Sequence, residues 1–354
     1  MSRRDIEHFE GCLLGGAIGD ALGAPIEFLS LDEICRRFGP DGVTGIEDVL
    51  GADSEGADVA RFTDDTQMTL FTAEGLLRAD SRFADRGICD VRGVIHRAYL
   101  RWLHTQGIET QFYDAEFGWH FDGWLVTVPG LSASRAPGGT CISALSRGRP
   151  IKDSKGCGGV MRVAPVGLMA YAGSSFELGC DSAAITHGHP SGFLSAGFLA
   201  LMIAEIIEGN SLREAIDASV EELKKHPDHE ECLEHILSAV KLAGDETASL
   251  SPETVERLGA GWVAEEALAI SIYCSMVAGN DFPRGVRFAI NHGGDSDSTG
   301  AITGNILGAL LGRGAIPEGW IAKLDMRDVI EEVAADLLSG FREEPGWWQK
   351  YPPW

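Results

Sequence analysis

The chain has 354 residues, of which 53 are acidic and 29 basic, giving a formal net charge of −24 at pH 7. Such a charge repels nucleic-acid phosphates and anionic lipid surfaces, so we expect no nucleic-acid partner and no membrane partner. The eight cysteines are dispersed, which excludes a zinc finger or a disulfide scaffold and favours reduced thiols. No uninterrupted apolar run has the roughly 18 to 20 residues of a membrane span, and the first apolar stretch lacks a signal-peptide cleavage pattern. We therefore expect a cytoplasmic protein.

Helical periodicity recurs along the whole chain, whereas the alternating pattern of strands is hard to find. After a first glycine-striped helix that ends near residue 23, the apolar spacing predicts helices over residues 64–77, 91–102, 192–208, 212–223, 232–240, 264–277 and 299–311. Clusters of Gly, Pro and Asn separate these helices, and none is long enough to be an interdomain linker. The chain is thus predicted to be a single all-α domain over residues 1–354.

Two segments depart from this regular pattern. Residues 106–150 are the least regular part of the chain, so we expect an irregular insertion there that lines the substrate site. Residues 341–354 form a tail rich in tryptophan and proline. We assign Trp347, Trp348 and Trp354 of this tail to packing or to contact with a partner.

Glycine makes up 45 of the 354 residues, roughly 13% against an average of about 7%. Eight of these glycines recur every four residues in two predicted helices, at Gly11, Gly15, Gly19 and Gly23 and at Gly300, Gly304, Gly308 and Gly312. A glycine inside a helix costs about 1 kcal/mol relative to alanine, so the stripes must gain from close backbone contact. Each stripe could pack against any neighbour, or the two could pack against each other, antiparallel. The second arrangement would bring Glu27 beside Asp295 and Asp297.

Acidic residues are concentrated at the predicted helix boundaries. One cluster is Thr63-Asp64-Asp65-Thr66, another is Asp295-Ser296-Asp297-Ser298, and Glu27 follows the first helix. N-capping explains any one cluster, because Asp, Ser and Thr favour helix starts. Crowded carboxylates nevertheless repel one another unless a cation neutralises them, and carboxylate and hydroxyl oxygens suit Mg²⁺ or Mn²⁺. The five carboxylates suffice for two such ions, whereas calcium-hand, P-loop and dinucleotide-binding motifs are missing.

Four segments together resemble the ADP-ribosylglycohydrolases. They are Gly11-Cys-Leu-Leu-Gly-Gly-Ala-Ile-Gly-Asp-Ala-Leu-Gly, Thr63-Asp-Asp-Thr, Thr186-His-Gly-His-Pro-Ser-Gly-Phe and His292-Gly-Gly-Asp-Ser-Asp-Ser-Thr-Gly-Ala, in the family's order. The family includes the dinitrogenase reductase-activating glycohydrolase and hydrolases of ADP-ribosylarginine and ADP-ribosylserine. The resemblance implies an all-α fold and a centre of two Mg²⁺ or Mn²⁺ ions that binds the diol of the distal ribose of ADP-ribose.

Carried over to this chain, the resemblance assigns metal ligands on two sides of the centre. The ligands are Thr63, Asp64 and Asp65 on one side and Asp295, Asp297 and Ser298 on the other, with Asp297 as the bridge. Glu27 matches the family's mobile glutamate, which contacts metal or substrate. The candidates for general base or proton shuttle are Glu27, Asp65, Asp295 and Asp297, and the sequence leaves open which of them acts.

The same resemblance assigns further residues to the ligand pocket. Ser154, Gly156, Cys157 and Gly158 match a Gly-Asn-Gly loop that contacts the diphosphate and the distal ribose, with Cys157 in place of the usual asparagine. Backbone N–H groups of such a loop can hold phosphate, although an ordinary turn has the same composition. His187 and His189 lie in the third motif, either as pocket imidazoles or as part of a structural helix entry at Pro190. Trp262 is either an aromatic platform for the ligand or a core residue.

The function that the resemblance implies is hydrolysis of the glycosidic bond between ADP-ribose and a side chain of an ADP-ribosylated protein substrate, with ADP-ribose as product. Arginine is the expected side chain, because the third and fourth motifs are closer to arginine-directed than to serine-directed members. The alternatives are hydrolysis of serine-linked or other O-linked ADP-ribose, a non-catalytic relative that binds ADP-ribose or a toxin, and a phosphohydrolase that releases AMP. Retention of all five carboxylates favours an enzyme.

Overall fold

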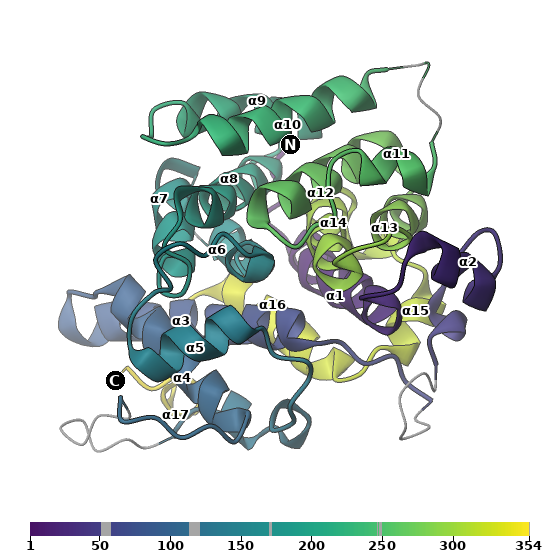
Figure 1. Ribbon diagram of the computed structural model, residues 1–354. Coiled ribbons are helices and arrows are strands. Elements are labelled where there is room, and N and C mark those ends of the chain that lie inside the picture. Colours follow the sequence, from purple (N-terminus) through teal and green to yellow (C-terminus); the bar gives the residue numbers. More distant parts are fainter. Residues whose placement is uncertain (51–57, 113–120, 170–171, 246, 248–249, 354) are drawn as a thin grey trace.

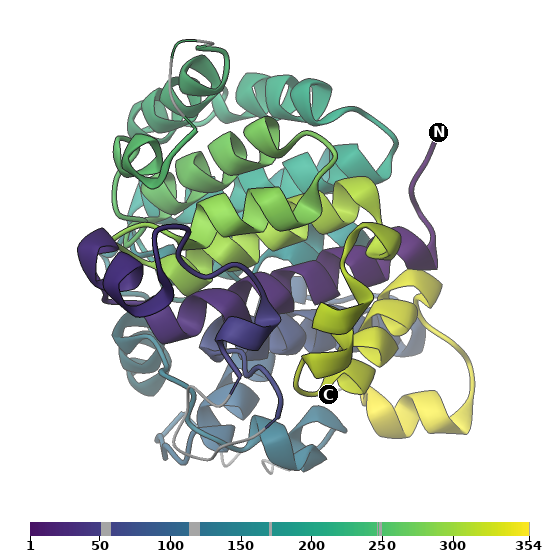
Figure 2. The ribbon, with the colours of Figure 1, turned by 90° about the vertical axis from the view of Figure 1, so that its right-hand side faces the viewer.

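Helices α1 (Ile6–Gly23) and α14 (Ser296–Leu311) lie side by side at the centre of the molecule, and the other helices pack around this pair (Figures 1 and 2). This computed structural model describes residues 1–50, 58–112, 121–169, 172–245, 247 and 250–353. Helices α9 and α10 form one end of the stack, and α3, α4 and α5 form the opposite end (Figure 1).

The elements have the following bounds. They are α1 Ile6–Gly23, α2 Leu31–Phe38, α3 Asp64–Arg86, α4 Val91–Thr105, α5 Gly139–Arg147, α6 Ala164–Met169, α7 Ala172–Ala183, α8 Pro190–Ile207, α9 Leu212–Leu223, α10 Glu230–Ala243, α11 Pro252–Glu256, α12 Ala264–Ala278, α13 Phe282–Ile290, α14 Ser296–Leu311, α15 Glu318–Lys323, α16 Arg327–Ser339 and α17 Pro345–Lys350, with the 3-10 helices η1 Ala24–Ile26, η2 Ile46–Asp48, η4 Leu125–Thr127, η5 Pro129–Leu131, η6 Cys157–Gly159 and η7 Arg313–Ala315.

Strand pairing within the described ranges is limited to isolated bridges, which join Ala60 to Leu324, Ile151 to His187 and Gly156 to Val263. The predicted all-α class is therefore confirmed. Several boundaries differ from the predicted ones because they depend on caps rather than on apolar spacing. Helix α3, for example, continues past residue 77 to Arg86, where Gly87 ends it in the left-handed conformation with φ +71°.

The two glycine stripes face each other along α1 and α14, which confirms the antiparallel arrangement. A Cβ atom on Gly11 would come within 2.5 Å of the carbonyl oxygen of Gly308, and Gly15 and Gly19 meet Gly304 and Gly300 equally closely. Such distances leave no room for any side chain, so the backbones are in direct contact. The spacing of four residues is thus explained by the helix pair itself.

This packing decides where the acidic segments lie. Because α1 and α14 run antiparallel, the end of α1 at Gly23 meets the backbone of Ser296 at the start of α14. The side chain of Asn305 reinforces the pair by donating to the carbonyl oxygen of Cys12 (2.8 Å). The residues just after α1 and just before α14 are therefore neighbours in space.

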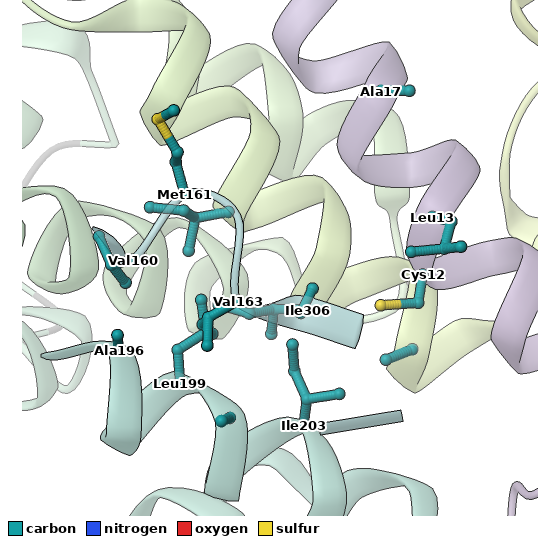
Figure 3. Packing of buried hydrophobic residues seen from close by; sticks show 14 of the residues in the cluster. Cys12, Leu13, Ala17, Val160, Met161, Val163, Ala196, Leu199, Ile203 and Ile306 are labelled. Atoms are coloured by element: carbon teal, nitrogen blue, oxygen red, sulfur yellow. The ribbon is translucent and has the colours of Figure 1, made fainter. Parts of the chain in front are cut away.

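Helix α8 (Pro190–Ile207) shows how apolar the core is. By length and composition, with a mean hydropathy of 1.7, it passes as a membrane span, although we expected no such segment from the sequence. Inside the protein 83% of it is buried, and it packs against α6, α7, α9 and α12. Figure 3 shows Leu199 and Ile203 of α8 in one cluster with Val163 and Ile306. Its apolar surface is thus accounted for by the protein core.

The segment over residues 106–150 is only partly irregular. It holds the short helices η4 and η5, and residues 139–147 form α5, which the sequence analysis missed. This helix begins at a glycine pair without a side-chain cap and ends at Gly148 with φ +62°, so its start lacks the usual capping signal. Residues 113–120 of the predicted insertion lie outside the described residues.

The tail is anchored through its tryptophans. Trp347 is 1% exposed and donates its indole N–H to the Ser81 hydroxyl (2.9 Å), and Trp348 packs on Phe341 with ring centroids 5.0 Å apart. These contacts confirm the packing role for Trp347. Trp354 lies outside the described residues.

Candidate metal centre

Asp20 joins the end of α1 to the start of α3. This aspartate is fully buried, and its carboxylate accepts hydrogen bonds from the backbone nitrogens of Thr63 (2.8 Å) and Thr66 (3.0 Å) and from the Thr66 hydroxyl (2.6 Å). The three bonds hold the first turn of α3 against α1. The side chains of Asp64 and Asp65, which belong to that turn, are thereby positioned.

Thr63, Asp64 and Asp65 begin α3 with both a cap and a loop contact. The Thr63 hydroxyl accepts from the backbone nitrogen of Asp65 (3.3 Å), so Thr63 is the N-cap. Oδ2 of Asp64 accepts from the backbone nitrogen of Gly138 (3.1 Å), which fixes this carboxylate from the side of the 106–150 segment. Oδ2 of Asp65 is buried and has no hydrogen-bond partner within the described part of the chain.

Glu27, Asp295 and Asp297 come together where α1 ends and α14 begins. Each offers a carboxylate oxygen, and these oxygens lie within 4.8 Å of one another. The backbone nitrogen of Asp295 donates to Ala260 (2.8 Å), and that of Ser298 donates to Oδ1 of Asp297 (2.9 Å). The contact of the glycine stripes thus produces the juxtaposition that the sequence analysis expected.

A cavity of about 330 Å³ opens over these helix ends. Its wall contains the predicted residues Glu27, Asp64, Asp65, Gly156, Cys157, Gly158, His187, Trp262, Asp295, Asp297 and Ser298. The glycine loop reaches this wall because the backbone nitrogen of Cys157 donates to the carbonyl oxygen of Trp262 (3.2 Å). Among the described residues the wall contains no lysine and no arginine. Negative charge in the cavity is therefore not neutralised by basic side chains of its wall.

The pKa values of these acids reflect burial and mutual repulsion. Burial raises the pKa of Glu27 to about 8 and that of Asp64 to about 8, and the negative charge of Asp297 adds to both. The same causes raise the pKa of Asp65 and of Asp295 well above the ordinary value. Without a cation, Glu27 and Asp64 therefore hold protons near neutral pH, which is the expected behaviour of crowded, desolvated acids.

The donor set fits a hard divalent cation. Carboxylate and hydroxyl oxygens predominate, as Mg²⁺ and Mn²⁺ prefer. A buried, unpartnered carboxylate oxygen such as Oδ2 of Asp65 is unfavourable unless it contacts a cation or a proton. Glu27, Asp295 and Asp297 would hold such an ion from the α1–α14 side, and Asp64 and Asp65 extend the donor set from α3. The sequence prediction of an acidic centre is thus matched by residues of three helix ends.

Cys157 departs from the family pattern but keeps a donor in place. Its thiol donates to Oδ2 of Asp295 (2.8 Å) and accepts from the Ser298 hydroxyl (3.5 Å). Burial, followed by the charge of Asp295, raises the pKa of this thiol well above its usual range. The thiol is therefore neutral and serves as a hydrogen-bond donor to a carboxylate of the centre.

Thr63, Ser154 and His189 are not among the residues of the cavity wall. The hydroxyl of Ser154 lies 3.2 Å from that of Thr140, which does line the cavity. His189 is the N-cap of α8, where Nδ1 accepts from the backbone nitrogen of Ser191 (3.2 Å). The structural alternative for His189, a helix entry, describes this geometry.

The sequence analysis did not assign several residues that the structure brings to the site. Residues 136–140 line the cavity. They belong to the 106–150 segment that we expected to line the substrate site, but the sequence analysis singled out none of them for the site. The only signal for Asp20 in the sequence is that it is a carboxylate within an apolar, glycine-rich helix. Phe28, with φ +68°, stacks on Trp262 at 5.1 Å between ring centroids. Trp262 is 40% exposed, so it belongs to the cavity rim and not to the core.

Comparisons with known proteins agree with this geometry. Residues 1–346 match the family model described as ADP-ribosylglycohydrolase. The chain is 25% identical to the ADP-ribosyl-[dinitrogen reductase] glycohydrolase of Rhodospirillum rubrum, over 90% of each protein. It is 24% identical to the ADP-ribosylarginine hydrolase Tri1 of Serratia proteamaculans, over 96% of this chain and 81% of that protein.

A solved structure titled "ADP-ribosylglycohydrolase-related protein complex" has the same fold. It superimposes with a TM-score of 0.65 at 26% identity, and the match covers 95% of this chain and 98% of that one. The likeness thus extends over sequence motifs, helix arrangement and nearly the whole length. The chain belongs to the ADP-ribosylglycohydrolase family.

Proposed function

We propose that this protein hydrolyses the bond between ADP-ribose and a modified arginine side chain, with the help of Mg²⁺ or Mn²⁺ held by the acidic centre. The observation that carries the proposal is the convergence of five carboxylates on one cavity whose wall has no lysine and no arginine among the described residues. Hydrolysis of a glycosidic bond uses carboxyl groups as acid, base or nucleophile. A protein that only binds ADP-ribose would not need five carboxylates in its cavity.

The residues of the cavity suit the steps of this reaction. An oxocarbenium-like transition state carries positive charge, which Asp64, Asp65 and Asp295 favour electrostatically once they have released the protons that they hold without a cation. Glu27 is the least buried of the five acids, and its pKa of about 8 lets it accept or release a proton near neutral pH. When bound, a divalent ion supplies orientation of the ribose hydroxyls and a lowered pKa for a bound water.

The glycine loop and the rim complete the proposed pocket. Residues 156–158 line the cavity, and glycine-rich backbone can present N–H groups to a diphosphate. Phe28 and Trp262 at the rim offer a flat apolar surface. Arginine is proposed as the linkage because the third and fourth sequence motifs resemble arginine-directed members, and a relative with the printed name ADP-ribosylarginine hydrolase aligns over 96% of the chain.

The test is release of free ADP-ribose from a protein that carries ADP-ribose on arginine, compared with one that carries it on serine, in Mg²⁺ or Mn²⁺. We expect cleavage of the arginine-linked substrate and loss of activity with a chelator. Asp295→Asn is expected to lower the rate at least about a hundredfold. Asp281→Asn, which changes an aspartate that caps α13, is the matched control and is expected to keep full activity.

Each other outcome has a distinct meaning. Cleavage of the serine-linked substrate alone contradicts the choice of arginine, and release of AMP indicates a phosphohydrolase. Binding of ADP-ribose without any cleavage would make the protein a non-catalytic relative. Equal rates for the wild type and Asp295→Asn would show that the acidic centre is not the active site.

A further inference from the structure

Arg162 is a buried arginine directly behind the cavity wall. It is 0% exposed, and no ion pair to a carboxylate is formed by it among the described residues. Its guanidinium lies 4.2 Å from the ring of Tyr99 and donates to the carbonyl oxygen of Ser182 (3.3 Å) and to the hydroxyl of Thr186 (2.7 Å). Burial of an arginine without a carboxylate partner is unfavourable, so a specific role for its hydrogen bonds is indicated.

The bond from Arg162 starts a chain of donors that leads to His187. Oγ1 of Thr186 lies 2.8 Å from Nδ1 of His187 and 3.3 Å from the carbonyl oxygen of Ala183. Oγ1 accepts from Arg162 and has a single proton of its own, and the direction of that proton decides the tautomer of the imidazole. If that proton points to Nδ1, then Nδ1 is an acceptor and the imidazole proton is on Nε2.

The carbonyl oxygen of Ala183 has no free lone pair for the Thr186 hydroxyl. It accepts from the backbone nitrogens of Thr186 and His187, both at 3.0 Å, and a carbonyl oxygen has two lone pairs. The contact from the hydroxyl to Nδ1 is also 0.5 Å shorter than the contact to this carbonyl, as 2.8 Å compares with 3.3 Å. The hydroxyl proton is therefore assigned to Nδ1 of His187.

The other ring nitrogen faces the ligand cavity. His187 lines the cavity, and Nε2 makes no hydrogen bond within the described part of the chain. A Cβ atom on Gly156 would lie 3.5 Å from Nε2, and one on Gly158 would lie 3.4 Å from it, so Nε2 lies along the glycine loop. Burial, with the charge of Arg162 as the second cause, lowers the pKa of His187 to about 3, which keeps the ring neutral at physiological pH.

We propose that Arg162 and Thr186 are positioning residues that hold His187 in the Nε2–H tautomer, so that His187 donates a hydrogen bond to an oxygen of the ligand in this cavity. The imidazole is then excluded as the general base, because its only free position already carries a proton. That role is left to the carboxylates. The ligand part of this proposal rests on the proposed function, whereas the tautomer does not.

Nitrogen NMR of the histidine side chains tests the tautomer without any substrate. In protein labelled with ¹⁵N-histidine, His187 is expected to show an unprotonated Nδ1 and a protonated Nε2, with the signals assigned by their loss in His187→Gln. Thr186→Val keeps the side-chain shape but removes the hydroxyl, so it is expected to give a mixture of tautomers. Thr186→Ser is expected to restore the single Nε2–H form. A wild-type signal from Nδ1–H, or an unchanged signal in Thr186→Val, would overturn the proposal.

Calorimetric titration of ADP-ribose in the presence of Mg²⁺ tests the second half. Thr186→Val is expected to weaken binding by the factor by which it lowers the Nε2–H fraction in the NMR measurement, and Thr186→Ser to restore it. Thr303→Val is the matched control, because Thr303 is buried in α14 and its hydroxyl has no partner among the described residues. Unchanged affinity in Thr186→Val contradicts the donor role. Absence of ADP-ribose binding in the wild type, with the expected tautomer present, refutes the proposed function. It does not contradict the positioning of His187 by Arg162 and Thr186.

Discussion

The contact between the glycine stripes predicts that a single methyl group at Gly304 destabilises the protein. A Cβ atom there would lie 2.5 Å from the carbonyl carbon of Gly15 and 3.0 Å from the backbone nitrogen of Gly16. Ordinary contacts of a Cβ atom begin at 3.4 Å, so the two helices would have to separate by about 1 Å. Backbone atoms cannot move aside as a flexible side chain does, so the strain falls on the whole α1–α14 pair.

The expected magnitude follows from two opposing effects. Overpacking of a tight core costs about 1–3 kcal/mol, and contact with backbone belongs at the upper end of that range. Replacement of a helical glycine by alanine in open surroundings stabilises a helix by about 1 kcal/mol. The net prediction for Gly304→Ala is a free energy of unfolding about 2 kcal/mol lower than that of the wild type.

Urea denaturation followed by circular dichroism measures this change. Gly319→Ala in α15 is the matched control, because a Cβ atom there has no neighbour within 4 Å, and it is expected to be neutral or slightly stabilising. The same shift of α14 also displaces Asp297, so Gly304→Ala is expected to bind Mg²⁺ more weakly. A Gly304→Ala protein as stable as the wild type would refute the close contact of the two backbones.

Three further predictions concern the acidic centre. Asp20→Asn replaces one of the two acceptor oxygens by an NH2 group, which faces at least one of the three donors that now bond to the carboxylate. Its free energy of unfolding is therefore expected to fall by about 2 kcal/mol in urea denaturation, with weaker Mg²⁺ binding. Full stability would contradict the bracing role of Asp20. Because the pKa values of Glu27 and Asp64 are about 8 without metal, Mg²⁺ must displace protons when it binds. The affinity for Mg²⁺ is therefore expected to rise from pH 6 to about pH 8 and then to level off. Calorimetry that detects no proton release at pH 7 would argue against this. Cys157→Val removes the donor to Asp295 and is expected to weaken Mg²⁺ binding several-fold in the same titration. Cys157→Ser keeps a donor at this position and is expected to bind Mg²⁺ like the wild type. Tighter binding by Cys157→Val than by Cys157→Ser would contradict the assigned hydrogen bond.

The stability of the metal-free protein should change with pH in the opposite sense. The pKa values of Glu27 and Asp64 are raised on folding, so their favourable contribution is complete below an unfolded pKa of about 4 and is lost as the pH rises through about 8. Mg²⁺ removes this loss by neutralising the ionised groups. The increase in melting temperature caused by Mg²⁺ is thus expected to be larger at pH 8 than at pH 6, measured by differential scanning calorimetry on the same sample. An equal increase at both values would contradict the raised pKa values.

Much of the architecture could be predicted from local patterns. Apolar spacing every three to four residues specifies amphipathic helices, and α9, α10 and α12 fall where that spacing placed them. The two glycine stripes also contain their own explanation, because only a neighbour without side chains compensates for so many helical glycines. From that contact alone the meeting of Glu27 with Asp295 and Asp297 could be inferred. The single-domain organisation, the cytoplasmic location and the absence of nucleic-acid and membrane partners stay predictions from the sequence.

Other features depended on contacts between segments distant in the chain, which no local pattern encodes. Helix α5 lacks a side-chain cap. Helix α8 has the length and composition of a membrane span, and only its packed neighbours show that it is a core helix. Asp20 and Arg162 acquire their roles only through partners 43 and 24 residues away, namely Thr63 and Thr186. The sequence by itself therefore determined helices such as α9, α10 and α12, the glycine stripes and the acidic residue types. Only the tertiary structure decided which acids share one cavity and which histidine faces it, because burial and hydrogen bonding depend on the packed neighbours.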